Sequence, residues 1–147
     1  MKHWIIPSND KFYHVDNAIA KLGRFIDWTQ RRQYEIGDIV YIYKTKTRNE
    51  PSYIRYMLEV VAIGLKFDDI IIDADYWVKP KDFYDNRGLP HVRLQLLADL
   101  GKGNYSLERK KLVDNGLKSS MQGAITVDGH LLDFINDAFL SYRDSSV

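Results

Sequence analysis

The chain has 147 residues, 45% of them hydrophobic, which suits one globular domain with a single core. A formal net charge of +1 excludes tight binding to nucleic acid by phosphate neutralisation alone, so any such affinity must come from local patches. The absence of cysteine excludes disulfides, thiol nucleophiles and cysteine-based metal sites, and it favours a reducing, cytoplasmic location.

The sequence also predicts no membrane partner. No apolar run reaches the roughly 18 residues that a bilayer-spanning helix needs. The N-terminus lacks the order of charged, apolar and small residues that is typical of a signal peptide. We therefore expect a soluble intracellular protein.

The first elements in chain order are a strand and a short helix. His3–Ile6 is an apolar run that Pro7 interrupts, which predicts a strand followed by a turn. From Val15 the apolar residues repeat at spacings of three and four as far as Gly23, a residue typical of helix C-caps. This spacing predicts a short helix.

The second predicted strand, Ile39–Tyr43, is aromatic on one face. Residues at i and i+2 of a strand share a face, so Tyr41 and Tyr43 point the same way. If Trp4 or Trp28 folds over this face, the result is a slot for a flat ligand, and a nucleobase is the commonest flat ligand.

The middle of the chain predicts further strands separated by loops. After a polar loop over Thr45–Pro51, Tyr53–Ile63 alternates with its even-numbered apolar residues on one face, as in a long strand of a curved sheet or barrel. Ile70–Ile72 is a brief apolar run typical of another strand. Lys79–Pro90 reads as a loop, and His91–Leu97 alternates as a half-buried strand.

Helical patterns return near the C-terminus. Ser106 is a good N-cap residue, and Gly116 suits the C-terminal end of the helix between them. From Asp128 an amphipathic helix is predicted by a stripe of apolar residues, namely Leu131, Leu132, Ile135 and Phe139. Strands and helices do not alternate regularly, so the pattern predicts one α+β domain over residues 1–147, built on a mostly antiparallel sheet or barrel.

Reactive side chains are sparse. The four histidines lack the i, i+4 spacing of a helical metal pair; they are His3, His14, His91 and His130. Asp73 and Asp75 could bind a divalent cation together with Asp68 or Asp69, but acidic residues beside a short strand are more often turn caps. We predict no catalytic residue, no metal and no cofactor.

Basic residues gather on both sides of the tyrosine strand. Arg31 and Arg32 precede it, and Lys44, Lys46 and Arg48 follow it. They are either ordinary solvated loop charges or contacts for the phosphates of a nucleic acid.

Four short motifs occur along the chain in the same order as in a known family. They are Trp4–Asn9, Ile26–Trp28, Gly37–Tyr43, and Asn115–Lys118 followed by Gln122–Gly123. Through them nearly the whole chain resembles the EVE domain family, a branch of the PUA-like superfamily related to the YTH and ASCH domains. The resemblance implies a barrel-like, mostly antiparallel sheet with peripheral helices and a pocket for a base, often a modified one.

The resemblance also implies where the pocket residues lie. Ser8 and Asn9 are similar to the polar edge that hydrogen-bonds a base, and Trp28 is similar to a pocket wall. Gln122 is similar to a late glutamine that closes the pocket. The chain departs from the family at Ser119–Met121, where many members have a proline before that glutamine.

The end of the tyrosine strand completes the implied site. Tyr43 is the second expected wall, and it precedes the variable polar positions that line the pocket, here Lys44 and Thr45. The phosphate contacts would then be Arg31, Arg32, Lys44 and Lys46.

These observations predict a non-catalytic module that reads a modified or flipped base in DNA or RNA. Stacking is worth about 1–3 kcal/mol per base, and edge hydrogen bonds and phosphate contacts add to it. A separate nuclease or effector protein is an expected partner. Two alternatives are a small nucleic-acid hydrolase of the ASCH type, and a small-metabolite or protein-interaction module that uses the same pocket.

Overall fold

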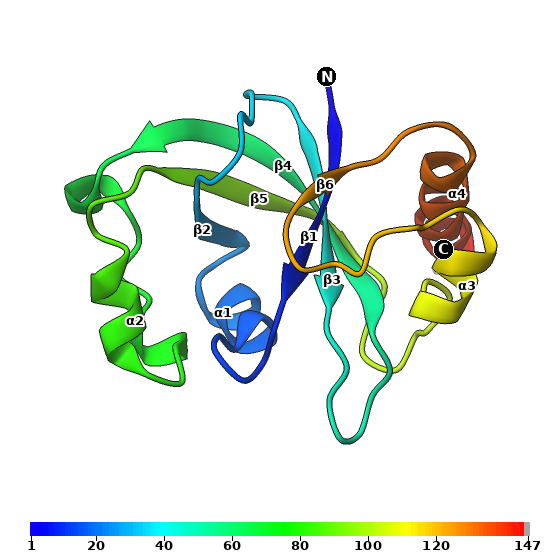
Figure 1. Ribbon diagram of the computed structural model, residues 1–147, viewed down its shortest axis with the longest axis horizontal. Helices are drawn as coiled ribbons and strands as arrows, with labels where there is room; N and C mark the ends of the chain where they lie inside the picture. The colour runs from blue at the N-terminus through cyan, green and yellow to red at the C-terminus, as the bar shows by residue number, and fades with distance from the viewer. Residues whose placement is uncertain (146–147) are drawn as a thin grey trace.

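A mixed six-stranded sheet forms the centre of the molecule, with the strand order β2-β5-β4-β3-β1-β6 (Figure 1). The structure, a computed structural model, describes residues 1–145, with side chains as far as Tyr142. The strands are β1 (His3–Ser8), β2 (Phe25–Thr29), β3 (Ile39–Lys44), β4 (Tyr53–Leu65), β5 (His91–Asp99) and β6 (Ile125–Thr126).

Helices cover both faces of this sheet. The helices are α1 (Val15–Lys21), α2 (Pro80–Asp85), α3 (Arg109–Asp114) and α4 (Gly129–Ser145), with short 3₁₀ turns η1 (Phe67–Asp69) and η2 (Ala74–Tyr76). In Figure 1, α1 and α2 lie to one side of β1 and β3, and α3 and α4 lie to the other. Within the described residues, no helix is long and apolar enough to cross a bilayer.

The strand pairing confirms the predicted α+β class and the mostly antiparallel sheet. Only β1 and β3 pair in parallel, and every other neighbouring pair is antiparallel. Strands β2 and β6 form opposite edges of the sheet and have no pairing with each other in residues 1–145. The sheet is therefore open, and the closed barrel that we predicted is not seen.

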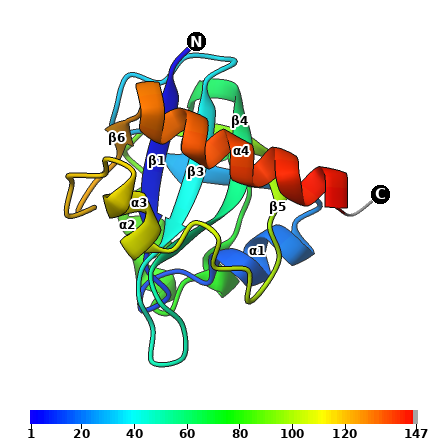
Figure 2. The same cartoon turned by 90° about the vertical axis from the view of Figure 1, so that its right-hand side faces the viewer.

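The tyrosine strand β3 is buried on both faces. Val40 and Ile42 belong to the core on the α1 side, whereas Tyr41 and Tyr43 belong to the core under α3 and α4. Figure 2 shows α4 running across the sheet in front of β1 and β3. The predicted alternation is thus correct, but both faces are covered.

The predicted slot over the tyrosines is wrong. Trp4 pairs with Val40 across β1 and β3, and directly paired residues point to the same face of a sheet. Trp4 and Trp28 therefore lie in the α1-side core, on the opposite face from Tyr41 and Tyr43. A strand pattern shows which residues share a face but not which face a distant tryptophan joins.

A bulge makes β4 change faces. Ile42 pairs with Tyr56 while the next residue, Tyr43, pairs with Ile54, so Arg55 is an extra residue on β4. Ile54 consequently joins the core under α4, whereas Tyr56 joins the core beside α1. The single apolar face that we predicted for this strand is divided between the two cores.

The segment between β4 and β5 also differs from prediction. Ile70–Ile72 is not a strand but irregular chain between η1 and η2. The predicted loop over Lys79–Pro90 contains α2, whose first residue is Pro80, a position that suits proline because the first helical N–H needs no partner. Phe83 of α2 is buried and lies beside Phe67 of η1, with 5.6 Å between ring centroids, so this segment packs on the neighbouring turns instead of lying free.

Three further elements can be compared with their predicted boundaries. Strand β1 continues through Pro7 to Ser8, because β6 pairs only with Trp4 and Ile5 and leaves the end of β1 with one neighbour, where proline is tolerated. Helix α3 begins at Arg109, after the predicted N-cap Ser106. The amphipathic helix predicted from Asp128 is confirmed as α4. The short edge strands β2 and β6 were not predicted.

Candidate functional site

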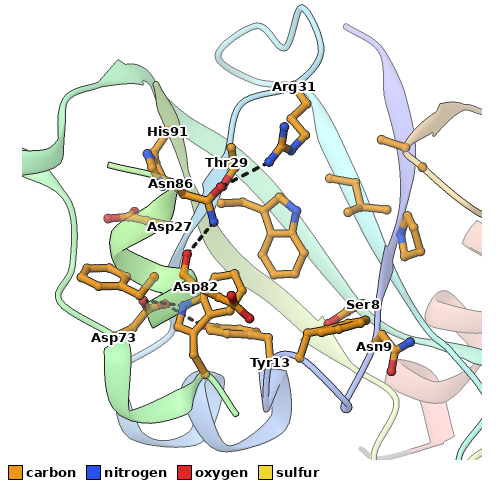
Figure 3. A pocket seen from close by; sticks show the side chains of 18 of the residues that line it. Ser8, Asn9, Tyr13, Asp27, Thr29, Arg31, Asp73, Asp82, Asn86 and His91 are labelled. Atoms are coloured by element: carbon orange, nitrogen blue, oxygen red, sulfur yellow. Dashed lines mark hydrogen bonds between the residues drawn. The ribbon is translucent and has the colours of Figure 1, made fainter. Parts of the chain in front are cut away.

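A cavity of about 800 Å³ opens on the α1 side of the sheet. One wall is formed by the ends of β1 and β2, and the other by residues 70–86, which include η2 and α2 (Figure 3). Residues 121–124, just before β6, complete the lining. Chain segments that are far apart in the sequence therefore meet around one space.

Two hydroxyl groups at the end of β1 and β3 have no hydrogen-bond partner among the described residues. Ser8 is 3% exposed, and both its Oγ and the Oγ1 of Thr45 are buried. The Thr45 amide donates to the Ser8 carbonyl at 3.0 Å, which fixes the two residues side by side. Buried hydroxyls without partners are rare and cost about 1–3 kcal/mol each. Both line the cavity, where a bound molecule could satisfy them.

Asn9 continues this polar edge into the turn after β1. Its Oδ1 accepts a hydrogen bond from the Lys11 amide at 2.9 Å, which stabilises the turn. Figure 3 shows Ser8 and Asn9 together at one side of the cavity, away from the aspartates at the other. The turn therefore presents a polar side chain beside the two free hydroxyls.

Aromatic rings form part of the cavity wall. Tyr13 packs edge-on against Trp28, with 5.7 Å between ring centroids and an interplanar angle of 90°. It makes a second edge contact with Trp77 at 5.1 Å. Such contacts hold the rings in fixed orientations. Phe12 lies at the cavity with 56% of its surface exposed.

Asp73 is buried behind these rings. Its Oδ2 accepts a hydrogen bond from the Tyr13 hydroxyl at 2.7 Å, and its Oδ1 accepts one from the Trp77 indole at 3.3 Å. Burial raises the pKa of Asp73, although both hydrogen bonds oppose that rise. Burial and the Asp73 charge likewise raise the pKa of Tyr13.

Asp27 joins the cavity wall to strand β5. Arg93 donates two hydrogen bonds to its carboxylate, at 2.9 Å and 3.0 Å, and the Ile71 amide donates a third at 2.7 Å. The hydrogen bonds to Asp27 raise the pKa of Arg93. This carboxylate therefore holds the irregular chain before η2 against the sheet.

Two arginines after β2 lie at the edge of the cavity, and both are exposed. Arg31 donates to the Asn86 side chain at 3.2 Å, and Asn86 in turn donates to the Asp82 carbonyl at 2.9 Å, a chain that Figure 3 shows. Arg32 donates to the Ala124 carbonyl at 3.2 Å. The arginines thus connect the loop after β2 with α2 on one side and with the segment before β6 on the other.

The segment before β6 is where the chain departs from the family pattern. Met121 has a φ of +59°, a left-handed conformation that is strained for a residue other than glycine. The Met121 amide donates a hydrogen bond to the Ser119 hydroxyl oxygen at 3.0 Å. A Cβ on Gly123 would lie 2.9 Å from the Arg32 Nη2, so the arginine packs directly over this glycine. The expected proline is absent, and a strained methionine shapes this part of the lining.

Seven of the ten predicted binding residues line this cavity. They are Ser8, Asn9, Trp28, Arg31, Arg32, Thr45 and Gln122. The segments that the resemblance brought together therefore do meet in space. Their roles in binding stay predictions.

The other three predicted residues lie elsewhere. Tyr43 is 2% exposed in the core under α4, where its hydroxyl accepts a hydrogen bond from Arg109 at 3.1 Å. Lys44 is 3% exposed, and its ammonium contacts the half-buried Asp16, so it serves a partly buried ion pair. Lys46 is exposed in the loop after β3 and does not line the cavity. None of the three belongs to the site that we propose.

Several lining residues were missed. Tyr13 and Trp77 belong to none of the motifs, and Asp27 lies within the Ile26–Trp28 motif but was given no role, because all three act through contacts between separate segments. Asp73 was noticed only as a weak candidate for a metal site with Asp75. The structure gives it two neutral donors instead, and within the described residues no three acidic or histidine side chains gather to hold a metal.

Comparison with known proteins identifies the fold. No family model and no curated protein matches the chain. Among solved structures, a hypothetical protein from Leishmania major is 17% identical, with a TM-score of 0.58 over 100% of this chain and 98% of that one. Human THYN1 in complex with DNA that contains 5-methylcytosine is 12% identical, with a TM-score of 0.60 over 93% and 96%. A mutant of ZmASCH from Zymomonas mobilis is 10% identical, with a TM-score of 0.59 over 93% and 98%.

These identities are low, so the likeness concerns the fold alone. A separate structure of human thymocyte nuclear protein 1 is described as its DUF55 domain and matches with a TM-score of 0.57. The matches cover nearly the full length of both chains in every case. The chain therefore has the PUA-like fold of the EVE and ASCH domains, as the resemblance predicted.

Proposed function

We propose that the cavity binds a single unstacked base of a nucleic acid and reads its edge and any modification it carries. The observation that carries this proposal is the pair of buried, unpartnered hydroxyls of Ser8 and Thr45 in a cavity walled by Trp28. Hydroxyls can donate and accept, which suits the mixed edge of a base. An indole face suits the ring itself.

The size and charge of the site support the same ligand. A volume of about 800 Å³ is within the range of small-ligand pockets and leaves room for a base with its sugar. The exposed Arg31 and Arg32 stand at the edge, where a phosphate would pass when the base is inside. A near-neutral protein then obtains most of its affinity from the base, with a modest contribution from phosphates.

The comparisons favour DNA as the first polymer to test. The THYN1 structure contains DNA with 5-methylcytosine, and that protein has the same fold as this chain. In a duplex the target base must be flipped out at a cost of a few kcal/mol, which a single strand avoids. RNA is the second polymer to test, because a base pocket does not by itself distinguish the sugars.

Replacing Trp28 with alanine is expected to weaken binding about 5- to 150-fold, since a stacked base contributes about 1–3 kcal/mol. Binding should be measured by fluorescence anisotropy on single-stranded and duplex oligonucleotides, with and without 5-methylcytosine or 5-hydroxymethylcytosine. Tyr84→Ala is a matched control, since it removes an exposed aromatic ring that does not line the cavity. Equal binding by the native protein and Trp28→Ala, abolished by salt in both, would reject the proposal.

Replacing Thr45 with valine separates stability from binding. Valine has the shape of threonine without the hydroxyl, so it removes a buried polar atom that lacks a partner. We expect the free energy of unfolding to rise by about 1 kcal/mol while oligonucleotide affinity falls several-fold. Thr126→Val, at an exposed position of β6, is the control for the substitution itself. Urea denaturation and the same anisotropy titration give both values, and a loss of stability would show that the hydroxyl has a partner in the free protein.

A further inference from the structure

The charges around the cavity are divided between its edge and its interior. Four aspartates and two arginines line it: Asp27, Asp73, Asp82, Asp85, Arg31 and Arg32. Both arginines are exposed, whereas Asp27 and Asp73 are buried. Asp82 is half-buried and Asp85 is exposed, so the edge carries charges of both signs, whereas the buried charges of the lining are both acidic. An acidic interior is the reverse of what an anionic group inside the cavity would need.

The two buried aspartates differ in their partners. Asp27 forms an ion pair with Arg93, so its charge is compensated within the protein. Asp73 is 4% exposed and forms no ion pair with any described residue; its partners are the neutral Tyr13 hydroxyl and Trp77 indole. A buried carboxylate without a cation is costly, because neutral donors replace only part of its hydration.

The groups around Asp73 suit a positively charged ring. Tyr13 and Trp77 donate to the carboxylate and stand edge-on to each other, and Trp28 completes the set of rings beside Tyr13. Aromatic faces attract cations by about 0.5–2 kcal/mol, and a flat cation can also stack on them. The orphan hydroxyls of Ser8 and Thr45 line the same cavity as acceptors or donors for the ring edge.

We propose that this cavity selects a nucleobase that carries a positive charge, such as a base methylated on a ring nitrogen, and that the Asp73 carboxylate is its counter-ion. This inference rests on the function proposed above and makes it more specific. A base methylated on carbon is neutral and leaves Asp73 uncompensated. A base methylated on a ring nitrogen supplies the missing charge in a flat group that the rings accept.

Two isomeric nucleosides test the proposal without phosphates. 3-Methylcytidine is a cation near neutral pH and 5-methylcytidine is neutral, although both carry one methyl group on the same ring system. We expect the native protein to bind 3-methylcytidine at least about tenfold more tightly than 5-methylcytidine, because a hydrogen bond between charged groups is stronger than one to a neutral group. The preference should fall below about twofold in Asp73→Asn, while the affinity for 5-methylcytidine changes little. Chemical shifts of the tryptophan indole protons follow both titrations.

Controls make each result decisive. Asp114→Asn makes the same change at an exposed carboxylate of α3 that does not line the cavity, and it should keep the preference. Thermal unfolding shows whether Asp73→Asn folds, and the preference of the native protein is a test that needs no variant. Equal binding of the two isomers by the native protein, or a preference that persists in a folded Asp73→Asn, overturns the charge proposal.

The two proposals fail in different ways. If oligonucleotides bind in a manner that depends on Trp28 but the isomers bind equally, only the charge proposal is rejected. If neither oligonucleotides nor nucleosides bind, both proposals are rejected together.

Discussion

Replacing Asp38 with alanine is expected to lower the free energy of unfolding by about 3–5 kcal/mol. Asp38 is 1% exposed and accepts three hydrogen bonds. The Lys2 amide donates to its Oδ1 at 2.9 Å, while the Trp4 indole and the Glu35 amide donate to its Oδ2, both at 3.0 Å. Alanine would leave these donors without a partner at the point where β1 begins beside β3. Urea denaturation followed by tryptophan fluorescence measures the loss.

This contribution should also depend on pH in a defined direction. Burial alone would raise the pKa of Asp38, but the hydrogen bonds from Lys2, Trp4 and Glu35 outweigh it, so the pKa lies below its ordinary value of 3.8. A lowered pKa means that the stabilisation is fully present above pH 3.8 and is lost as the pH falls through the folded-state pKa. The stability difference between native protein and Asp38→Ala should therefore shrink in strong acid.

A matched substitution isolates the effect of the three hydrogen bonds. Asp133→Ala removes an exposed carboxylate from the second turn of α4 and should change stability by less than about 0.5 kcal/mol. A cost below about 1 kcal/mol for Asp38→Ala would contradict the prediction, because it would mean that the donors find water instead.

Periodicity was enough to predict the strands that carry long alternating patterns. The predictions for β3, β4, β5 and α4 hold because each has an apolar repeat over five residues or more, and burial enforces such a repeat. Strand β6 has only two residues, and the five residues of β2 begin with two adjacent apolar side chains, Phe25 and Ile26, so neither shows a regular alternation. The α2 segment was predicted as a loop partly because it contains Pro80, which is in fact the first residue of the helix.

The site was less predictable than the fold. The motifs of the resemblance contained Ser8, Trp28 and Gln122, and the structure places all three in the lining of one cavity. Tyr43 was placed wrongly, since its face depends on how β1 pairs with β3, and strand periodicity contains no information on pairing. Tyr13 and Asp73 lie 60 residues apart, and their hydrogen bond joins two segments that an isolated β-bridge between Tyr13 and Trp77 also holds together. No local sequence pattern predicts a contact of this kind.

Replacing Asp27 with alanine is expected to damage both the fold and the cavity. Its side chain is 2% exposed, and it binds Arg93 through two hydrogen bonds and the Ile71 amide through a third. Alanine would leave the Ile71 amide without a partner, and the half-buried Arg93 guanidinium would keep only the Asp69 carbonyl, which accepts from its Nη2 at 3.1 Å, at a cost of about 3–5 kcal/mol. Because Ile71 is two residues from Asp73, release of its amide should also loosen the acidic end of the cavity.

Two further variants separate the ion pair from the backbone contact. Asp27→Asn removes the charge but keeps an acceptor for the Ile71 amide, so it should protect that amide from hydrogen exchange better than Asp27→Ala does. In the double variant Asp27→Ala/Arg93→Met, the unpaired guanidinium is gone, and the loss of stability should be clearly smaller than the sum of the two single losses. Additive losses would show that the Asp69 carbonyl is a sufficient partner for Arg93 once Asp27 is gone. In that case Asp27 would hold the cavity wall through Ile71 alone, and nucleoside affinity would follow the exchange rate of that amide instead of global stability.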